Sequence, residues 1–219
     1  MATVGADFVW RMEQVLDLYA EAPDPRRPLV NFDEKPYQLL SHARPPLPVE
    51  PGQPERIDYE YKREGTCNLF LFLDRHRGWR HLDVTAQRTA VDFAHQMRWL
   101  VDEAYPQAEV IRVVLDNLNT HTPASLYQAF PPEEARRIAK RLEFHYTPKH
   151  ASWLNMAEIE FSVLERQCLD RRLTSRDEVA QEVGAWEVDR NAAGATILWR
   201  FTTTDARTKL HRFYPSPTQ

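Results

Sequence analysis

The chain has 219 residues, of which 42% are hydrophobic and 11% aromatic. This composition can fill one buried core, and it excludes collagen-like, disordered and disulfide-scaffold proteins. The formal net charge of −4 argues against a protein that coats nucleic acid with its whole surface, although a local basic groove is compatible with it. The two cysteines, and the lack of a long apolar run or a signal peptide, predict a reduced cytoplasmic protein with no membrane segment.

The N-terminal part of the sequence predicts one helix, one strand and a long loop. Apolar residues recur at helical spacing over 7–20, and closely spaced prolines follow this segment. A mostly apolar run predicts a strand over 29–40, in which Pro36 could introduce a bend. Residues 42–56 contain five prolines and predict a loop whose length is often functional in compact domains.

The rest of the chain predicts further strands that alternate with helices. Residues 68–73 and 79–84 read as two strands joined by a turn at Arg77–Gly78. The run Val110–Leu115 is mostly β-branched, which is typical of a buried central strand, and it ends at Asp116. The other expected elements are helices over 88–104, 123–129, 132–141, 153–169 and 176–191, the last capped by Ser175, and a strand over 143–146. This order predicts an α/β fold with a mixed sheet flanked by helices.

Three acidic residues stand out by their positions. Asp33 follows an apolar strand segment, Asp116 ends the most strand-like run, and Glu158 lies on a predicted helix. Carboxylates at the ends of central strands converge in α/β sheets, and a cluster of three needs a cation to offset its repulsion. On position alone, however, a turn or helix-capping aspartate is the simpler explanation for Asp116.

Longer strings around these acids carry a family resemblance. The sequence reads NFDEKPYQLL at 31–40, LDNLNTH at 115–121 and YTPKHASWLNMAEIEFSVLERQCL at 146–169. These strings resemble the catalytic core of bacterial insertion-sequence transposases related to the mariner superfamily, the DDE superfamily endonuclease group. The resemblance runs from about Phe8 to Pro215 and implies a ribonuclease-H-like (retroviral-integrase-like) fold, with which the predicted order of elements agrees.

The resemblance implies a role for each of the three acids. Asp33, Asp116 and Glu158 match the family's first, second and third catalytic acids, which together would hold two Mg²⁺ or Mn²⁺ ions. Glu160 competes with Glu158, because both flank the apolar stripe of the predicted helix about equally; only the resemblance selects Glu158. Glu34 is adjacent to the first acid, but strand alternation points it to the other face.

Other residues of the family strings are candidates for contacts with DNA. Asn117 and His121 belong to the DN-x-x-x-H string, and His121 could contact a phosphate, tune the metal site, or serve as a capping or core histidine. Lys149 and His150 precede the long helix and could hold DNA phosphates or form a solvated turn. Trp153 could stack on a base, although an aromatic residue at a helix start is more often part of the core.

The resemblance also predicts how the chain is divided. It places a catalytic domain at 26–195, preceded by an N-terminal helix and linker at 1–25 and followed by a C-terminal tail at 196–219. Relatives carry an N-terminal helix-turn-helix region that recognises the ends of the element. This chain begins close to the catalytic core, so we expect the second part of a split gene, a fragment or a decayed copy.

The activity implied is metal-dependent cleavage of DNA at the ends of an insertion sequence, followed by attack of the freed 3′-hydroxyl on target DNA. The implied partners are DNA, a second copy in a homodimer, and a separate helix-turn-helix polypeptide. One alternative is a catalytically silent relative that binds DNA or a transposase and acts as a regulator. A second is a ribonuclease-H-like nuclease that hydrolyses DNA without joining strands.

Overall fold

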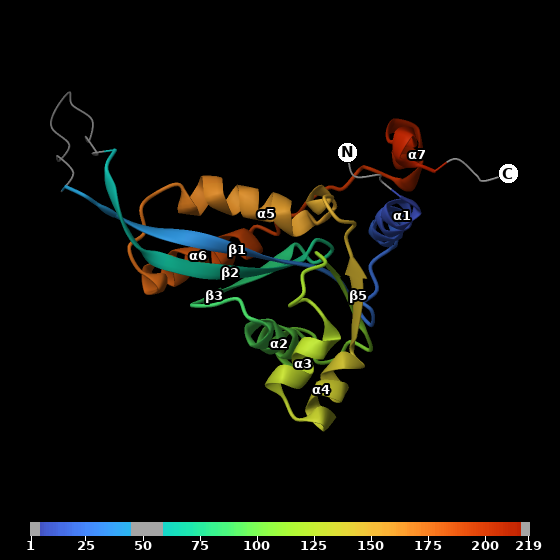
Figure 1. Ribbon diagram of the computed structural model, residues 1–219, viewed down its shortest axis with the longest axis horizontal. Coiled ribbons are helices and arrows are strands. Elements are labelled where there is room, and N and C mark those ends of the chain that lie inside the picture. The colour runs from blue at the N-terminus through green and yellow to red at the C-terminus, as the bar shows by residue number, and fades with distance from the viewer. Residues whose placement is uncertain (1–4, 45–58, 216–219) are drawn as a thin grey trace.

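A five-stranded mixed sheet forms the centre of the molecule (Figure 1). The computed structural model describes residues 5–44 and 59–215. Along the sheet the order is β3-β2-β1-β4-β5; β1, β2 and β3 pair antiparallel, and β4 and β5 run parallel to β1. The strands are β1 (Leu29–His42), β2 (Tyr61–Asp74), β3 (Trp79–Thr85), β4 (Ile111–Leu115) and β5 (Leu142–Tyr146). This arrangement confirms the predicted mixed sheet.

Seven α-helices lie within the described residues, and six of them match predicted segments. They are α1 (Ala6–Ala20), α2 (Ala90–Trp99), α3 (Pro123–Ala129), α4 (Pro132–Ala139), α5 (Met156–Leu164), α6 (Arg176–Ala192) and α7 (Thr203–Lys209). The long helices predicted over 88–104 and 153–169 are not α-helical to their ends. α2 is followed directly by the π-helical turn Leu100–Ala104, and α5 by the π-helical turn Glu165–Leu169. Short 3-10 turns occupy Ser152–Leu154 and His211–Phe213. The predicted cap is present: the Ser175 hydroxyl accepts a hydrogen bond from the Glu178 amide.

Helices cover both faces of the sheet, and strand alternation divides the core between them (Figure 1). Phe70 and Phe72 of β2 pack with α2, α3 and α4 on one face. Leu69 and Leu71, which alternate with them, pack with α5 and α6 on the other. Each face of the sheet therefore has its own apolar cluster. The candidate functional residues described below lie near the end of β4, between these two clusters.

Two strands differ from their predicted form. The predicted bend at Pro36 is absent, since Pro36 pairs in register with Asn68 and the irregularity lies between Leu39 and Leu40. Pro36 is tolerated because β4 pairs with β1 only near its start, which leaves one edge of β1 unpaired there. β2 starts at Tyr61, well before the predicted residue 68. The sequence does not indicate this earlier start, because the first residues of the strand are mostly polar and exposed and show no apolar pattern. Most of the predicted loop over 42–56 lies outside the described residues, and its first residue, His42, ends β1.

A third apolar cluster joins α1 to the C-terminal segment. The Tyr19 hydroxyl on α1 donates a hydrogen bond of 2.8 Å to the carbonyl of Leu154. Arg207 on α7 forms an ion pair with Glu13 of α1 at 2.8 Å. α7 was not predicted from the sequence, and a capping box at Thr202 and Asp205 begins it. No helix in the described ranges is long and apolar enough to cross a membrane.

Candidate active site

Asp33 and Asp116 occupy equivalent positions on neighbouring parallel strands. β1 and β4 pair over Leu29–Asn31, and Asn31 lies opposite Val114. Each aspartate follows two residues after this last pair, so a strand spacing of about 4.8 Å brings the two residues near each other. Asp116 therefore lies at a strand end, as predicted, rather than capping a helix.

The three predicted acids share one electrostatic environment. Asp33 is 8% exposed, and this burial is the main cause that raises its pKa, to about 7. The Glu34 amide donates a hydrogen bond to Asp33 Oδ1 (2.8 Å), which opposes the rise, whereas the negative charges of Glu158 and Asp116 add to it. The charges of Glu158 and Asp116 thus both disfavour the ionised form of Asp33.

The donor chemistry of these acids fits a hard divalent cation. Mg²⁺ and Mn²⁺ prefer carboxylate oxygens, and a cation would favour the ionised form of Asp33, which burial and, to a smaller extent, the charges of Glu158 and Asp116 disfavour. In the described part of the chain, no three histidine, cysteine or acidic side chains converge at ligand distances. The Asp116 carboxylate contacts His121 instead: its Oδ1 lies 2.5 Å from Nδ1 of His121.

Asn155 links the helix that carries Glu158 to the strand that carries Asp33. It is the N-cap of α5, where its side-chain oxygen accepts a hydrogen bond of 3.2 Å from the Ala157 amide. Its amide nitrogen donates to the Phe32 carbonyl at 2.8 Å and lies 3.4 Å from Asp33 Oδ2. One buried side chain therefore fixes the start of α5 against β1.

The structure separates Glu158 from Glu160. Glu158 is in the first turn of α5, is exposed, and contributes to the electrostatic field at Asp33. Glu160 is fully buried and forms ion pairs with Arg80 of β3 and Arg190 of α6. Its carboxylate is occupied by these partners, so Glu158 is the candidate for the third acid.

His121 lies inside the protein, between Asp116 and Glu34. Its ring is fully buried and stacks on Phe93 with a centroid separation of 4.9 Å. Nε2 lies 3.2 Å from Glu34 Oε2, and Nδ1 faces Asp116. Burial opposes the protonated form, but the hydrogen bonds to Asp116 and Glu34 outweigh it and raise the pKa of His121 to about 9. This position favours the tuning role over contact with a DNA phosphate.

The other predicted DNA-contacting residues line one cavity beside the second acid. Asp116, Asn117, Lys149 and His150 surround a volume of about 480 Å³. Asn117, Lys149 and His150 are exposed, and His150 adopts a left-handed backbone conformation with φ 66°. Trp153 is 43% exposed and meets Phe201 edge-on, with its ring centroid 5.6 Å away, so it is not a core residue.

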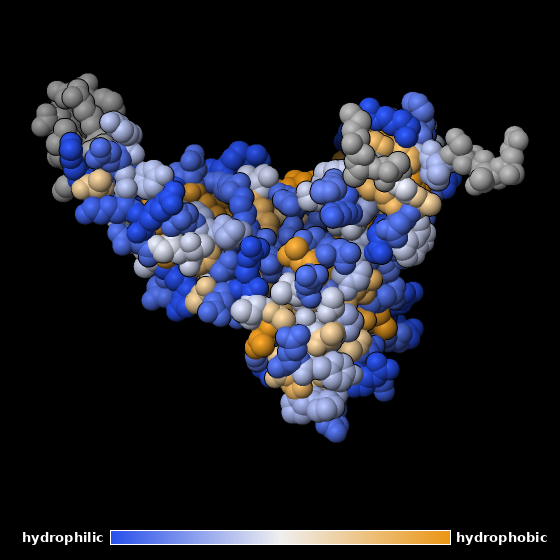
Figure 2. Space-filling model, in the orientation of Figure 1, coloured by the Kyte–Doolittle hydropathy of each residue, from blue (hydrophilic) through white to orange (hydrophobic). Residues whose placement is uncertain are grey.

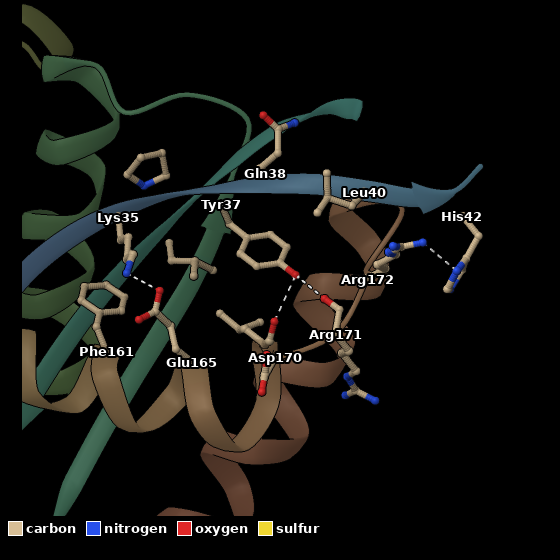
Figure 3. Close-up of a pocket in the computed structure, with 13 residues that line it drawn as sticks. Lys35, Tyr37, Gln38, Leu40, His42, Phe161, Glu165, Asp170, Arg171 and Arg172 are labelled. Atoms are coloured by element: carbon tan, nitrogen blue, oxygen red, sulfur yellow. Dashed lines mark hydrogen bonds and ion pairs between the residues drawn. The ribbon is translucent and has the colours of Figure 1, made fainter. Parts of the chain in front are cut away.

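A second cavity, of about 700 Å³, lies farther along β1 and contains none of the three acids (Figure 3). Lys35 forms an ion pair with Glu165, and an Arg172 nitrogen lies 2.9 Å from Nδ1 of His42. The Tyr37 hydroxyl donates a hydrogen bond to the carbonyl of Arg171 (3.0 Å). The acids, rather than this cavity, therefore define the candidate site.

Figure 2 shows that hydrophilic residues cover most of this view of the molecule, with apolar residues in small groups.

Two residues of the site were not identified from the sequence. Asn155 could have been found as an N-cap, since an asparagine there immediately precedes a helical pattern. Glu34 was correctly placed on the face opposite to Asp33, but its contact with His121 joins segments 87 positions apart and leaves no local signal.

Comparisons with known proteins identify the family and the fold. Residues 28–180 match a family model described as DDE superfamily endonuclease. The Mos1 strand transfer complex matches with a TM-score of 0.58 and 16% identity, over 85% of this chain and 55% of that chain. The pre-cleavage Mos1 transpososome gives 0.57 and 16%, over 94% and 60%. The Mos1 mariner paired-end complex with Mn gives 0.56 and 17%, over 87% and 59%.

These likenesses show that the fold is the ribonuclease-H-like fold of the Mos1 chains. The chain spans only 55–60% of the length of those three solved chains. No curated protein matches the sequence.

Proposed function

Because this chain belongs to the DDE superfamily endonucleases, we propose that it is the catalytic part of a DNA transposase that cleaves insertion-sequence ends and joins them to target DNA. The observation that supports this most directly is the placement of the acids. Asp33 on β1 and Asp116 at the end of β4 are in equivalent positions. The charge of Glu158, on α5, contributes to the electrostatic field at the Asp33 carboxyl group.

In this proposal the three acids hold the reacting groups around a phosphodiester. Cleavage and joining are both in-line phosphoryl transfers, so positioning and charge neutralisation supply most of the catalysis. Asp33, Asp116 and Glu158 would hold Mg²⁺ or Mn²⁺, as two ions. A bound divalent cation would supply charge neutralisation and activation of the attacking oxygen. Asn155, which binds the carbonyl of Phe32 next to Asp33, and His121, which contacts the Asp116 carboxylate, would hold these acids in position without binding the metal themselves.

DNA would be held next to the acids by the cavity that Lys149, His150 and Asn117 line. Within this group Lys149 carries the ammonium side chain, so we expect it to contact a phosphate. Removing it should weaken DNA binding for all sequences alike and reduce the slope of affinity against salt by about one. Fluorescence anisotropy on Lys149→Ala tests this, with Lys140→Ala on the far end of α4 as the control.

The assembly is also a proposal. The resemblance to transposase cores supports a homodimer that binds element ends and target DNA, with end recognition supplied by a helix-turn-helix polypeptide. It likewise supports a catalytic domain at 26–195, between an N-terminal helix with its linker and a C-terminal tail.

The experiment that tests the activity is a strand-joining assay with Mn²⁺. A labelled duplex with a free 3′-hydroxyl is incubated with plasmid target DNA and wild-type protein, Asp116→Asn or Glu158→Gln. We expect joined product with the wild type, and its loss in both variants. Glu165→Gln is the matched control, because Glu165 follows α5, is exposed and pairs with Lys35 outside the site.

The same assay distinguishes the alternatives. Cleaved but never joined DNA would favour the nuclease. DNA binding with neither cleavage nor joining would favour the regulator. Joining that survives in Asp116→Asn would contradict the assignment of Asp116.

A further inference from the structure

Glu34 is the adjacent acid that alternation directs away from Asp33, yet its side chain is only 3% exposed. Its two oxygens have separate partners. Oε2 lies 3.2 Å from Nε2 of His121, and Oε1 accepts a hydrogen bond of 3.2 Å from Arg88. Burying a carboxylate is costly unless it is paired and hydrogen-bonded, and both oxygens of Glu34 have such partners.

His121 connects Glu34 to the second acid. On the ring edge away from Glu34, Nδ1 lies 2.5 Å from Asp116 Oδ1. The ring has little freedom to turn, since Phe93 stacks on one side and Phe32 meets it edge-on at 5.4 Å. The backbone of His121 is also fixed, because its carbonyl accepts a hydrogen bond of 2.7 Å from the Tyr146 hydroxyl.

The result is a chain of contacts from β1 to the end of β4. Asp33 and Glu34 are consecutive residues, so the chain Glu34–His121–Asp116 leads from the strand position of the first acid to the carboxylate of the second. We propose that Glu34 is a positioning residue of the active site, which acts through His121 to orient the Asp116 carboxylate. This inference rests on the proposed function, because it assigns Asp116 to the metal site.

Arg88 provides an internal control. It contacts the same carboxylate as His121 does, but through the other oxygen, and its side chain is 46% exposed. Removing Arg88 leaves the contact between Glu34 and His121 in place. A role through His121 therefore predicts different outcomes for Glu34 and Arg88 variants.

The first test needs no metal. Unfolding in urea is measured for the wild type, Glu34→Ala, Asp116→Ala and the double variant, all in the presence of a chelator. If Glu34 acts on Asp116 through His121, the two effects on the unfolding equilibrium constant should deviate from a simple product by about threefold or more. The matched cycle of Arg88→Ala with Asp116→Ala should be additive. Additive effects of Glu34 and Asp116 would overturn the inference.

The second test measures Mn²⁺ affinity by calorimetry on the full chain. Glu34→Ala should weaken binding about tenfold or more, as is usual when a group behind a metal ligand is lost. Glu34→Gln keeps an acceptor oxygen for His121 and should recover most of the affinity, and Arg88→Ala should match the wild type. Unchanged affinity in Glu34→Ala with lower stability would show a structural role only, and Glu34→Gln as weak as Glu34→Ala would show that charge alone matters. Either result overturns positioning.

The two tests separate this inference from the proposed function. A wild-type protein that binds no Mn²⁺ would count against the proposed metal site, and the metal-free cycle would then decide alone whether Glu34 acts on Asp116. A wild type that binds Mn²⁺, with additive unfolding effects, would overturn the role of Glu34 and leave the proposed function standing.

Discussion

Nε of Arg80 lies 3.0 Å from Oε1 of Glu160, and neither side chain is exposed to solvent. Arg190 of α6 pairs with the same carboxylate, and Asn191 accepts hydrogen bonds from the amide and guanidinium of Arg80. β3, α5 and α6 thus meet at one buried charge. Because Glu158 is two residues from Glu160 on α5, this ion pair also limits how that helix can rotate.

Removing one partner of this pair should be strongly destabilising. Glu160→Leu leaves the Arg80 guanidinium buried without its carboxylate, and we expect a loss of about 3–5 kcal/mol in the free energy of unfolding. The double variant Arg80→Met/Glu160→Leu should lose less, because the fully buried charge of Arg80 is removed together with the carboxylate and only the partly exposed Arg190 loses its partner. Urea unfolding measures both, and a double variant as unstable as the sum of the single changes would contradict this account.

Asn155 should contribute through two separable interactions. Asn155→Ala removes the N-cap of α5 and the donor to the Phe32 carbonyl, and should cost about 1–3 kcal/mol. Asn155→Ser keeps a capping oxygen and loses only the donor, so it should lie between the wild type and the alanine variant. Equal stability of the serine and alanine variants in thermal unfolding would mean that the cap contributes nothing.

Gly78 is required at the turn between β2 and β3. Its φ is 61°, and a Cβ built there would lie 2.8 Å from the carbonyl oxygen of Gly194. Gly78→Ala should therefore cost about 1–3 kcal/mol. The control is Gly184→Ala in the middle of α6, where a Cβ meets nothing within 4 Å and alanine should stabilise by about 0.5–1 kcal/mol. Thermal unfolding should move in opposite directions for the two variants.

The contact between α1 and α7 should weaken in acid. Hydrogen bonds from Arg207 lower the pKa of Glu13 from its ordinary 4.5, although partial burial works against them. A lowered pKa gives stability that is present above about 4.5 and is lost as the pH falls through the folded-state value. Hydrogen exchange of α7 should therefore speed up below that pH relative to the sheet. Glu13→Gln should remove this dependence, and an unaltered pH profile in that variant would refute the assignment.

The sequence predicted elements wherever an apolar period was strong. The run Val110–Leu115 stood out because it is almost entirely apolar, and from Ile111 on it forms β4, a fully buried strand that lies inside the sheet between β1 and β5. The start of β2 was missed because residues 61–66 are exposed and held only by pairing with β1. The π-helical turns after α2 and α5 were also missed, since one extra residue per turn leaves no mark on composition.

The candidate site divides in the same way. Family strings selected Asp33, Asp116 and Glu158 as candidates, whereas helical phase could not separate Glu158 from Glu160. That distinction depends on Arg80, 80 residues away on another element, so no local pattern contains it. The contact of Glu34 with His121 was missed for the same reason.

Cys67 on β2 and Cys168 in the turn after α5 are free thiols that belong to one apolar cluster. They are 1% and 6% exposed, and burial raises the pKa of both thiols. Alkylating reagents react with the exposed thiolate, so neither cysteine is accessible while α5 and α6 cover the sheet. The rate at which these two cysteines are alkylated should therefore measure how often α5, the helix that bears Glu158, separates from β1 and β2.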